Sequence, residues 1–132
     1  MSNLPELYFR IRDNGAAVFR ISTENRERRI EMDQIAVVNT NRGDFKAQGD
    51  NTLSPDEETV INDWMQKRIA TLAARDVDDI HRAIDHLNLT AQWAQAKASD
   101  AQLEEITDDL LMAMHDLRSV LVRKKADRLG KS

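Results

Sequence analysis

The spacing of apolar residues changes near Ser54-Pro55, and this change limits the folds that the chain can adopt. Before this point, apolar residues alternate in short runs that are interrupted by Asn-Gly and Arg-Gly pairs, as in strands joined by tight turns. After it, apolar residues recur every three or four positions almost to the end, as in amphipathic helices. The sequence therefore predicts an α+β fold: an antiparallel meander of four to five strands over residues 1–53, followed by three long antiparallel helices over residues 54–132. We expect the two layers to pack as one compact domain.

Two strands, Leu7–Arg12 and Ala16–Ser22, are predicted on either side of Asp13-Asn14-Gly15. A two-residue Asn-Gly turn would place Phe9 opposite Arg20 and mix polar with apolar side chains. A three-residue loop with a left-handed Gly15 instead places Phe9 opposite Phe19 and separates the two faces, so we expect this register.

The opposite face of this hairpin would carry an aromatic residue among arginines, namely Tyr8, Arg10, Arg12 and Arg20. Such a face can stack a base and neutralise phosphates, as single-strand-binding proteins do. The other interpretation is a solvated face whose arginines pair with acidic side chains across the strands.

Three further elements are predicted before the helices. A polar loop, Thr23–Glu27, leads into a short strand at Arg28–Met32. The continuous apolar run Ile35–Val38 indicates a strand that is central or covered on both faces. A turn at Asn41-Arg42-Gly43 then precedes a last strand at Asp44–Gln48.

The helix boundaries follow from capping signals. Ser54, Pro55 and Glu57 have the pattern of an N-cap, a first-turn proline and a capping box, and this helix should end near Ala74. Asp76 can cap a second helix that runs to about Lys97. Ser99 and Gln102 form another capping-box pattern, which opens a third helix that ends at Gly130 and has a possible break at Thr107-Asp108-Asp109.

Each predicted helix has one apolar stripe that should close a bundle seam. The stripes are Val60, Ile61, Trp64, Met65, Ile69 and Leu72; Ile80, Ile84, Leu87, Ala91, Ala94 and Ala98; and Leu103, Ile106, Leu110, Met114, Leu117 and Leu121. Leu89 and Trp93 lie on the opposite side of the second helix, next to His86. Either this helix is central, or Leu89, Trp93 and His86 form a partner-binding patch.

Charge is distributed unevenly along the chain. Residues 51–117 carry 5 basic and 14 acidic side chains, whereas residues 118–132 carry 6 basic and 1 acidic. The acidic middle disfavours nucleic acid, although the basic end, with Arg123, Lys124 and Lys125, is a second candidate for contacting a polyanion. The alternative role of these residues is to complement the C-terminal end of a helix dipole.

Few residues have the pattern of a catalytic or metal site. The chain has no cysteine, so thiolate ligands and a thiol nucleophile are excluded. Asp78, His81 and Asp85 share a helix face, but they lack the second motif that a carboxylate-bridged metal centre needs. His115 has no nucleophile at a recognisable spacing, and no phosphate-binding glycine loop is present. We therefore expect no enzyme activity, no cofactor and no metal.

Charged side chains interrupt the first twenty residues, which predicts no signal peptide or membrane span and a cytoplasmic location. Amphipathic helices without a catalytic constellation predict a small non-catalytic regulatory, adaptor or assembly protein that acts through protein–protein interaction. Its partner would be an unidentified protein, and a homo-oligomer is possible. The alternative is a nucleic-acid-binding protein that uses the Tyr8/arginine face or the basic C-terminal helix end.

Overall fold

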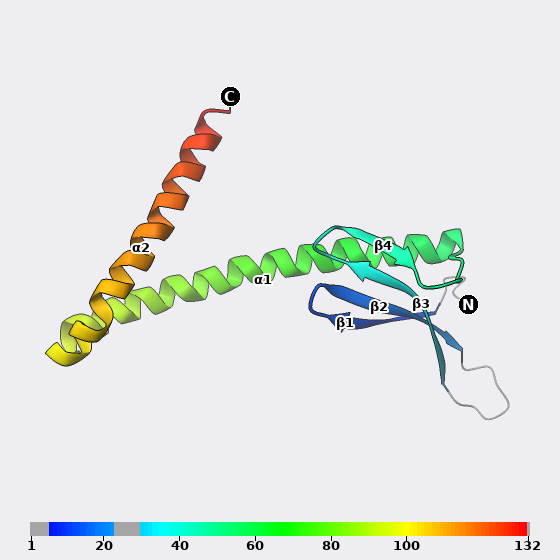
Figure 1. Cartoon of the computed structure of the whole chain (residues 1–132), viewed down its shortest axis with the longest axis horizontal. Helices are drawn as coiled ribbons and strands as arrows, with labels where there is room; N and C mark the ends of the chain where they lie inside the picture. Colours follow the sequence, from blue (N-terminus) through cyan, green and yellow to red (C-terminus); the bar gives the residue numbers. More distant parts are fainter. Residues whose placement is uncertain (1–5, 23–29, 132) are drawn as a thin grey trace. The chain divides into compact units, whose positions relative to one another are not determined.

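The computed structural model describes residues 6–22 and 30–131 (Figure 1). It contains four strands and two helices: β1 (Leu7–Arg12), β2 (Gly15–Ser22), β3 (Glu31–Asn39), β4 (Asp44–Ala47), α1 (Pro55–Ala96) and α2 (Asp100–Leu129). The α+β class and the N-terminal antiparallel sheet are confirmed, but the prediction of three helices is wrong. The chain divides between Asp79 and Ile80 into two compact units, and α1 continues from the first into the second.

The four strands form one antiparallel sheet in the order β1-β2-β3-β4. A two-residue turn, Asp13–Asn14, joins β1 to β2, and Gly15 already pairs with Arg12. Phe9 consequently lies opposite Val18, so the predicted pairing of Phe9 with Phe19 is wrong.

Gly15 explains this register. A Cβ on Gly15 would lie 1.8 Å from the carbonyl oxygen of Val38, so only glycine allows β3 to approach so closely. Gly15 is part of β2 and lacks the positive φ that the predicted three-residue loop required. The close approach of β3 fixes the position of Gly15, and the β1–β2 pairing follows from it.

β3 is a single strand that includes the apolar run Ile35–Val38 and the end of the predicted strand Arg28–Met32. The predicted loop Thr23–Glu27 and the residues Arg28 and Arg29 lie outside the described residues. β3 lies between β2 and β4, which confirms that the apolar run belongs to an interior strand. The turn before β4 contains Gly43 with a φ of 75°, as a left-handed turn residue.

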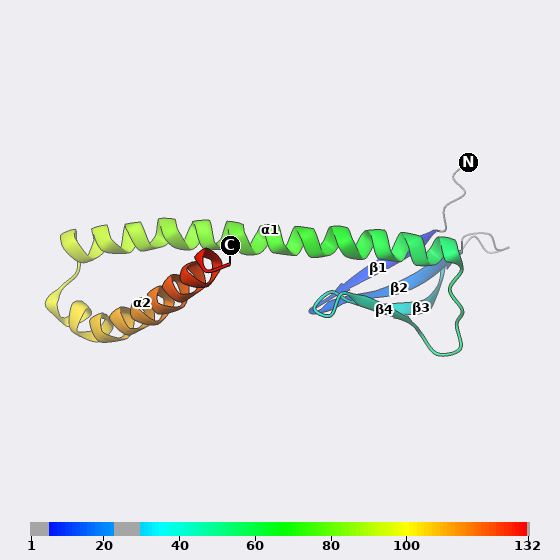
Figure 2. The ribbon, with the colours of Figure 1, turned by 90° about the horizontal axis from the view of Figure 1, so that it is seen from above.

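The start of α1 packs on one face of the sheet, as both views show (Figures 1 and 2). Ser54 and Glu57 form the predicted capping box: the Glu57 amide donates to Ser54 Oγ at 3.1 Å, and the Ser54 amide donates to Glu57 Oε1 at 3.0 Å. Ile61 and Met65 are buried against the sheet. The core of this unit consists of these two residues together with Ala16, Val18, Ile35, Ala36 and Val38.

α1 has no break at Ala74–Asp76, where the sequence predicted the end of one helix and the cap of another. Neither glycine nor proline occurs near this point, and Ala73, Ala74 and Arg75 all favour helix. An aspartate inside a helix costs at most about 0.7 kcal/mol relative to alanine. The capping preference of Asp76 is therefore too weak to end the helix.

α2 begins with the predicted capping box of Ser99 and Gln102. It continues through Thr107–Asp109 without the break that these residues allow. The Thr107 hydroxyl donates to the Leu103 carbonyl at 2.6 Å, so it bonds within the helix instead of capping a new one. Neither α1 nor α2 carries an apolar stretch of the length that a bilayer crossing requires.

Candidate functional site

In the unit that begins at Ile80, burial is confined to the neighbourhood of the turn between α1 and α2. The half-buried residues here are Thr90, Trp93, Ala94, Ala98, Leu103, Ile106, Thr107 and Leu110. All other described side chains of this unit are exposed, including every one from Leu111 to Leu129. The two helices therefore bury little of each other beyond the helical turns that lie closest to their connection.

A groove of about 690 Å³ lies between α1 and α2 near this turn. It is lined by His86, Leu87, Thr90 and Trp93 of α1, and by Glu105, Ile106, Asp109, Leu110 and Ala113 of α2. Apolar side chains predominate in its lining, with Asp109 and Glu105 contributed by α2. Such a groove can hold an apolar side chain or a helix face.

From the lining of the groove, apolar residues at helical spacing continue along each helix, and all of them are exposed except the half-buried Leu110. We call this set of residues the hairpin stripe. It consists of Ile80, Ile84 and Leu87 on α1, and Leu110, Met114, Leu117 and Leu121 on α2. Ile84 is 48% exposed and Leu117 is 54% exposed. Leu87 and Leu110 of this stripe also line the groove, so the stripe adjoins it on both helices.

The predicted partner-binding residues lie at the edge of this surface. His86 and Trp93 line the groove, and Trp93 also lines a smaller hollow with Leu89. Leu89 is 62% exposed, and Trp93 is half-buried. That Leu89, Trp93 and His86 bind a partner stays a prediction. Sequence reasoning assigned the hairpin stripe to a closed bundle seam, because it expected a third helix to complete the bundle.

The residues predicted to form an arginine and tyrosine face are separated by the sheet. Arg20 binds Glu57 of α1 on the helix-covered side, with its Nε 2.8 Å from Oε2. Arg10 lies over the ring of Phe19, with its guanidinium carbon 4.5 Å from the ring centroid, and Tyr8 is 6.3 Å from the same ring. Arg12 is exposed at the end of β1. Three of the four predicted residues, Tyr8, Arg10 and Arg12, therefore share one face of the sheet, and Arg20 lies on the other.

The ion pair of Arg20 and Glu57 displaces the pKa values of both of its members. The hydrogen bonds from Arg20 lower the pKa of Glu57, although burial acts in the opposite direction. The hydrogen bonds to Glu57 likewise raise the pKa of Arg20. Both charges therefore persist at neutral pH, and the pair fastens α1 to the sheet.

The histidines and carboxylates of the second unit do not converge on a metal site. Within residues 6–22 and 30–131, no three His, Asp or Glu side chains are placed to hold an ion. His81 and Asp85 are exposed on α1. His115 Nδ1 lies 3.3 Å from Asp116 Oδ1 on the exposed part of α2.

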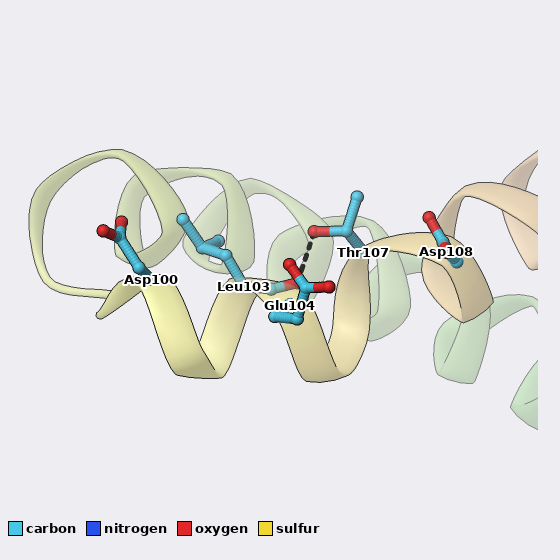
Figure 3. A pocket seen from close by; sticks show the side chains of 5 residues that line it. All are labelled: Asp100, Leu103, Glu104, Thr107 and Asp108. Atoms are coloured by element: carbon cyan, nitrogen blue, oxygen red, sulfur yellow. Dashed lines mark hydrogen bonds between the residues drawn. The ribbon is translucent and has the colours of Figure 1, made fainter.

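A second hollow, of about 360 Å³, lies along the first three turns of α2 (Figure 3). Asp100, Leu103, Glu104, Thr107 and Asp108 line it. Figure 3 shows the apolar Leu103 side chain on the same face as the carboxylates, with the Thr107 hydroxyl bonded back to the helix. This face of α2 combines one apolar side chain, Leu103, with an acidic border of Asp100, Glu104 and Asp108.

The acidic residues of this border belong to an uneven distribution of charge along α2. Five acidic side chains and no basic one occur in residues 100–109, whereas residues 118–128 contain five basic side chains and one acidic one. The predicted polyanion-binding residues Arg123, Lys124 and Lys125 lie in the basic half and are exposed. α2 therefore presents complementary charges at its two ends.

Comparison of the chain with protein-family models, with curated proteins and with solved structures gives no match.

Proposed function

We propose that the protein is a non-catalytic interaction protein, of a regulatory, adaptor or assembly type, whose docking surface is the hairpin stripe. The observation that carries this proposal is the exposure of the stripe on both helices, from Ile80 on α1 to Leu121 on α2. α1 begins in the sheet unit and continues into the unit that carries the stripe. His86 and Trp93 of the predicted patch line the groove beside the stripe, and Leu89 lines a smaller hollow with Trp93.

The energetics of isolated helices support this proposal. Helices in water gain most of their stability from packing an apolar face, rather than from the intrinsic propensities of their residues. The stretch from Leu111 to Leu129 buries no side chain within the chain. It nevertheless carries Met114, Leu117 and Leu121 at the spacing of a packed face. A protein that covers this face would supply the missing stabilisation.

Site-specific photocrosslinking in cells of origin tests this proposal. p-Benzoylphenylalanine is introduced at Leu117, within the stripe, and at Ser119, which lies on a different side of the same helix. Both positions are exposed in the single chain, so neither replacement should disturb folding. We expect discrete protein adducts from position 117 and none of comparable yield from position 119.

Equal, diffuse labelling from both positions would contradict the proposal. Adducts of position 117 with nucleic acid alone would contradict it as well, and would favour a polyanion-binding role for the basic half of α2.

A further inference from the structure

We infer that a second copy of this chain covers the hairpin stripe. In this dimer the two α2 helices pack against each other and run antiparallel. This inference rests on the proposed function and names its partner. Two features of α2 carry it: the spacing of the stripe residues, and the opposite charges of the two helix ends. Each can be followed position by position.

The stripe on α2 matches itself in the antiparallel direction. Its residues Leu110, Met114, Leu117 and Leu121, together with the preceding Leu103 and Thr107, follow the alternating three- and four-residue spacing of a coiled-coil seam. When Leu110 is placed opposite the partner's Leu121, Met114 falls opposite the partner's Leu117. The two-fold axis repeats both contacts, since the same patch faces itself in a symmetric dimer. Four consecutive layers are therefore entirely leucine and methionine.

Charge selects the antiparallel direction. In the alignment above, Glu104 lies two residues along the axis, about 3 Å, from the level of the partner's Lys125. Both residues flank the seam on the same side of the helix, which is the arrangement of interhelical ion pairs. A parallel dimer would instead place the acidic first half of α2 beside the partner's acidic first half, which costs energy through like-charge repulsion.

The acidic hollow of Figure 3 lies on the face that this alignment uses. Leu103 and Thr107 belong to the seam, and Glu104 borders it. The partner's Arg128 falls opposite Leu103, so its aliphatic stem would cover the leucine while its guanidinium reaches the carboxylates. The hollow is thus filled at each end of the dimer by the basic end of the other α2.

The other flank of the seam remains available to α1. Ile106 and Ala113 lie on that flank and line the groove against α1, and the seam residue Leu110 lies at the border and lines the groove as well. Each α2 would therefore contact its own α1 on one side and the partner's α2 on the other. Two such hairpins make a four-helix assembly whose inner surfaces include the stripe residues Ile84 and Leu87.

Sedimentation equilibrium of the full chain, with paired charge reversals, tests the inference. The wild type should show a dimer that dissociates on dilution. Glu104→Lys alone and Lys125→Glu alone should each raise the dimer dissociation constant about tenfold, since each creates two like-charge contacts. An equimolar mixture of the two variants should return to wild-type affinity, because the heterodimer restores both ion pairs.

Glu105→Lys and Arg123→Glu are the matched controls. They carry the same charge changes away from this contact, so mixing them should not restore affinity.

The possible results separate this inference from the proposed function. A monomer at the highest soluble concentration would overturn the dimer, whether α2 then folds back onto α1 or binds another protein. A dimer whose mixed variants show no rescue would overturn the antiparallel arrangement. If the chain is monomeric but position 117 still gives discrete crosslinks, the interaction function stands with a different partner. If the chain is monomeric and position 117 gives no discrete crosslinks, both proposals are wrong.

Discussion

Arg20 on β2 and Glu57 in the first turn of α1 form a two-armed ion pair, with Nε 2.8 Å from Oε2 and Nη2 2.9 Å from Oε1. Glu57 is buried, and its Oε1 also accepts the Ser54 amide. The same carboxylate therefore caps the helix and fastens it to the sheet. Glu57 therefore helps to set the orientation of the first turns of α1 on the sheet.

This pair predicts a defined pH dependence of stability. Because Arg20 lowers the pKa of Glu57 in the folded state, the stabilisation is complete above the ordinary glutamate pKa of about 4.3 and is lost as the pH falls through the lowered value. Glu57→Gln should cost about 1 kcal/mol at neutral pH, since Arg20 is partly exposed. The difference between wild type and variant in free energy of unfolding should shrink below pH 4.3.

Urea unfolding followed by Trp64 fluorescence in a Trp93→Phe background measures this difference for the sheet unit. A difference in free energy of unfolding between wild type and Glu57→Gln that stays constant down to the lowest pH measured would contradict the role of the ion pair.

Phe9 and Trp64 form the second link between sheet and helix. Their rings are parallel to within 6°, with centroids 4.4 Å apart. Phe9→Ala and Trp64→Ala should each destabilise the sheet unit by about 2–3 kcal/mol, because both residues are half-buried. A double-mutant cycle, monitored by circular dichroism, should give a coupling of about 0.5–1.5 kcal/mol. Strictly additive losses would show that the rings do not interact.

Gly15 and Gly43 offer a matched test of why each glycine is present. Gly15→Ala would force a methyl group to within 1.8 Å of the Val38 carbonyl oxygen, and we expect it to prevent the sheet from forming. Gly43 has a φ of 75° but open space around its Cβ position, so Gly43→Ala should cost only about 1–2 kcal/mol. Thermal unfolding of both variants decides the point. Similar, small losses would mean that β3 does not approach Gly15 so closely.

Proline at position 77 tests whether α1 is continuous. If Asp76 capped a separate helix, Val77 would be the first helical residue, where proline is well tolerated. In the continuous helix of the structure, Val77→Pro removes a backbone hydrogen bond and should cost about 3 kcal/mol of local stability. Helical ellipticity at 222 nm should fall for Val77→Pro, and Val77→Ala is the matched control. Unchanged ellipticity would restore the two-helix interpretation of residues 54–97.

Local signals in the sequence predicted much of the fold. The capping boxes at Ser54 and Ser99 are complete within four residues, so they were identified correctly. The β1–β2 register was not, because it depends on the approach of Val38 to Gly15, a contact between strands that are distant in sequence. The helix break at Asp76 was predicted from a weak capping preference, which uninterrupted helix formers on either side override.

The candidate surface was only partly identifiable. Leu89 and Trp93 were predicted to bind a partner because they lie opposite the main stripe of their helix, and this stays a prediction. Ile84 and Leu117 were assigned to a bundle core, since helical spacing marks an apolar face without showing what covers it. Their exposure became visible only once the number of helices was known, because two helices leave the stripe open where three would close it.

Hydrogen–deuterium exchange across α2, measured over a range of chain concentrations, tests the central claim most directly. α2 buries no side chain within the chain beyond Leu110, so its amides from Leu111 to Leu121 should exchange rapidly at low concentration. If a second copy covers the hairpin stripe, these amides should become protected as the concentration rises. Leu117→Asp should abolish that protection, and Ser119→Asp should leave it unchanged. Exchange of this segment that does not change with concentration in the wild type would contradict the claim.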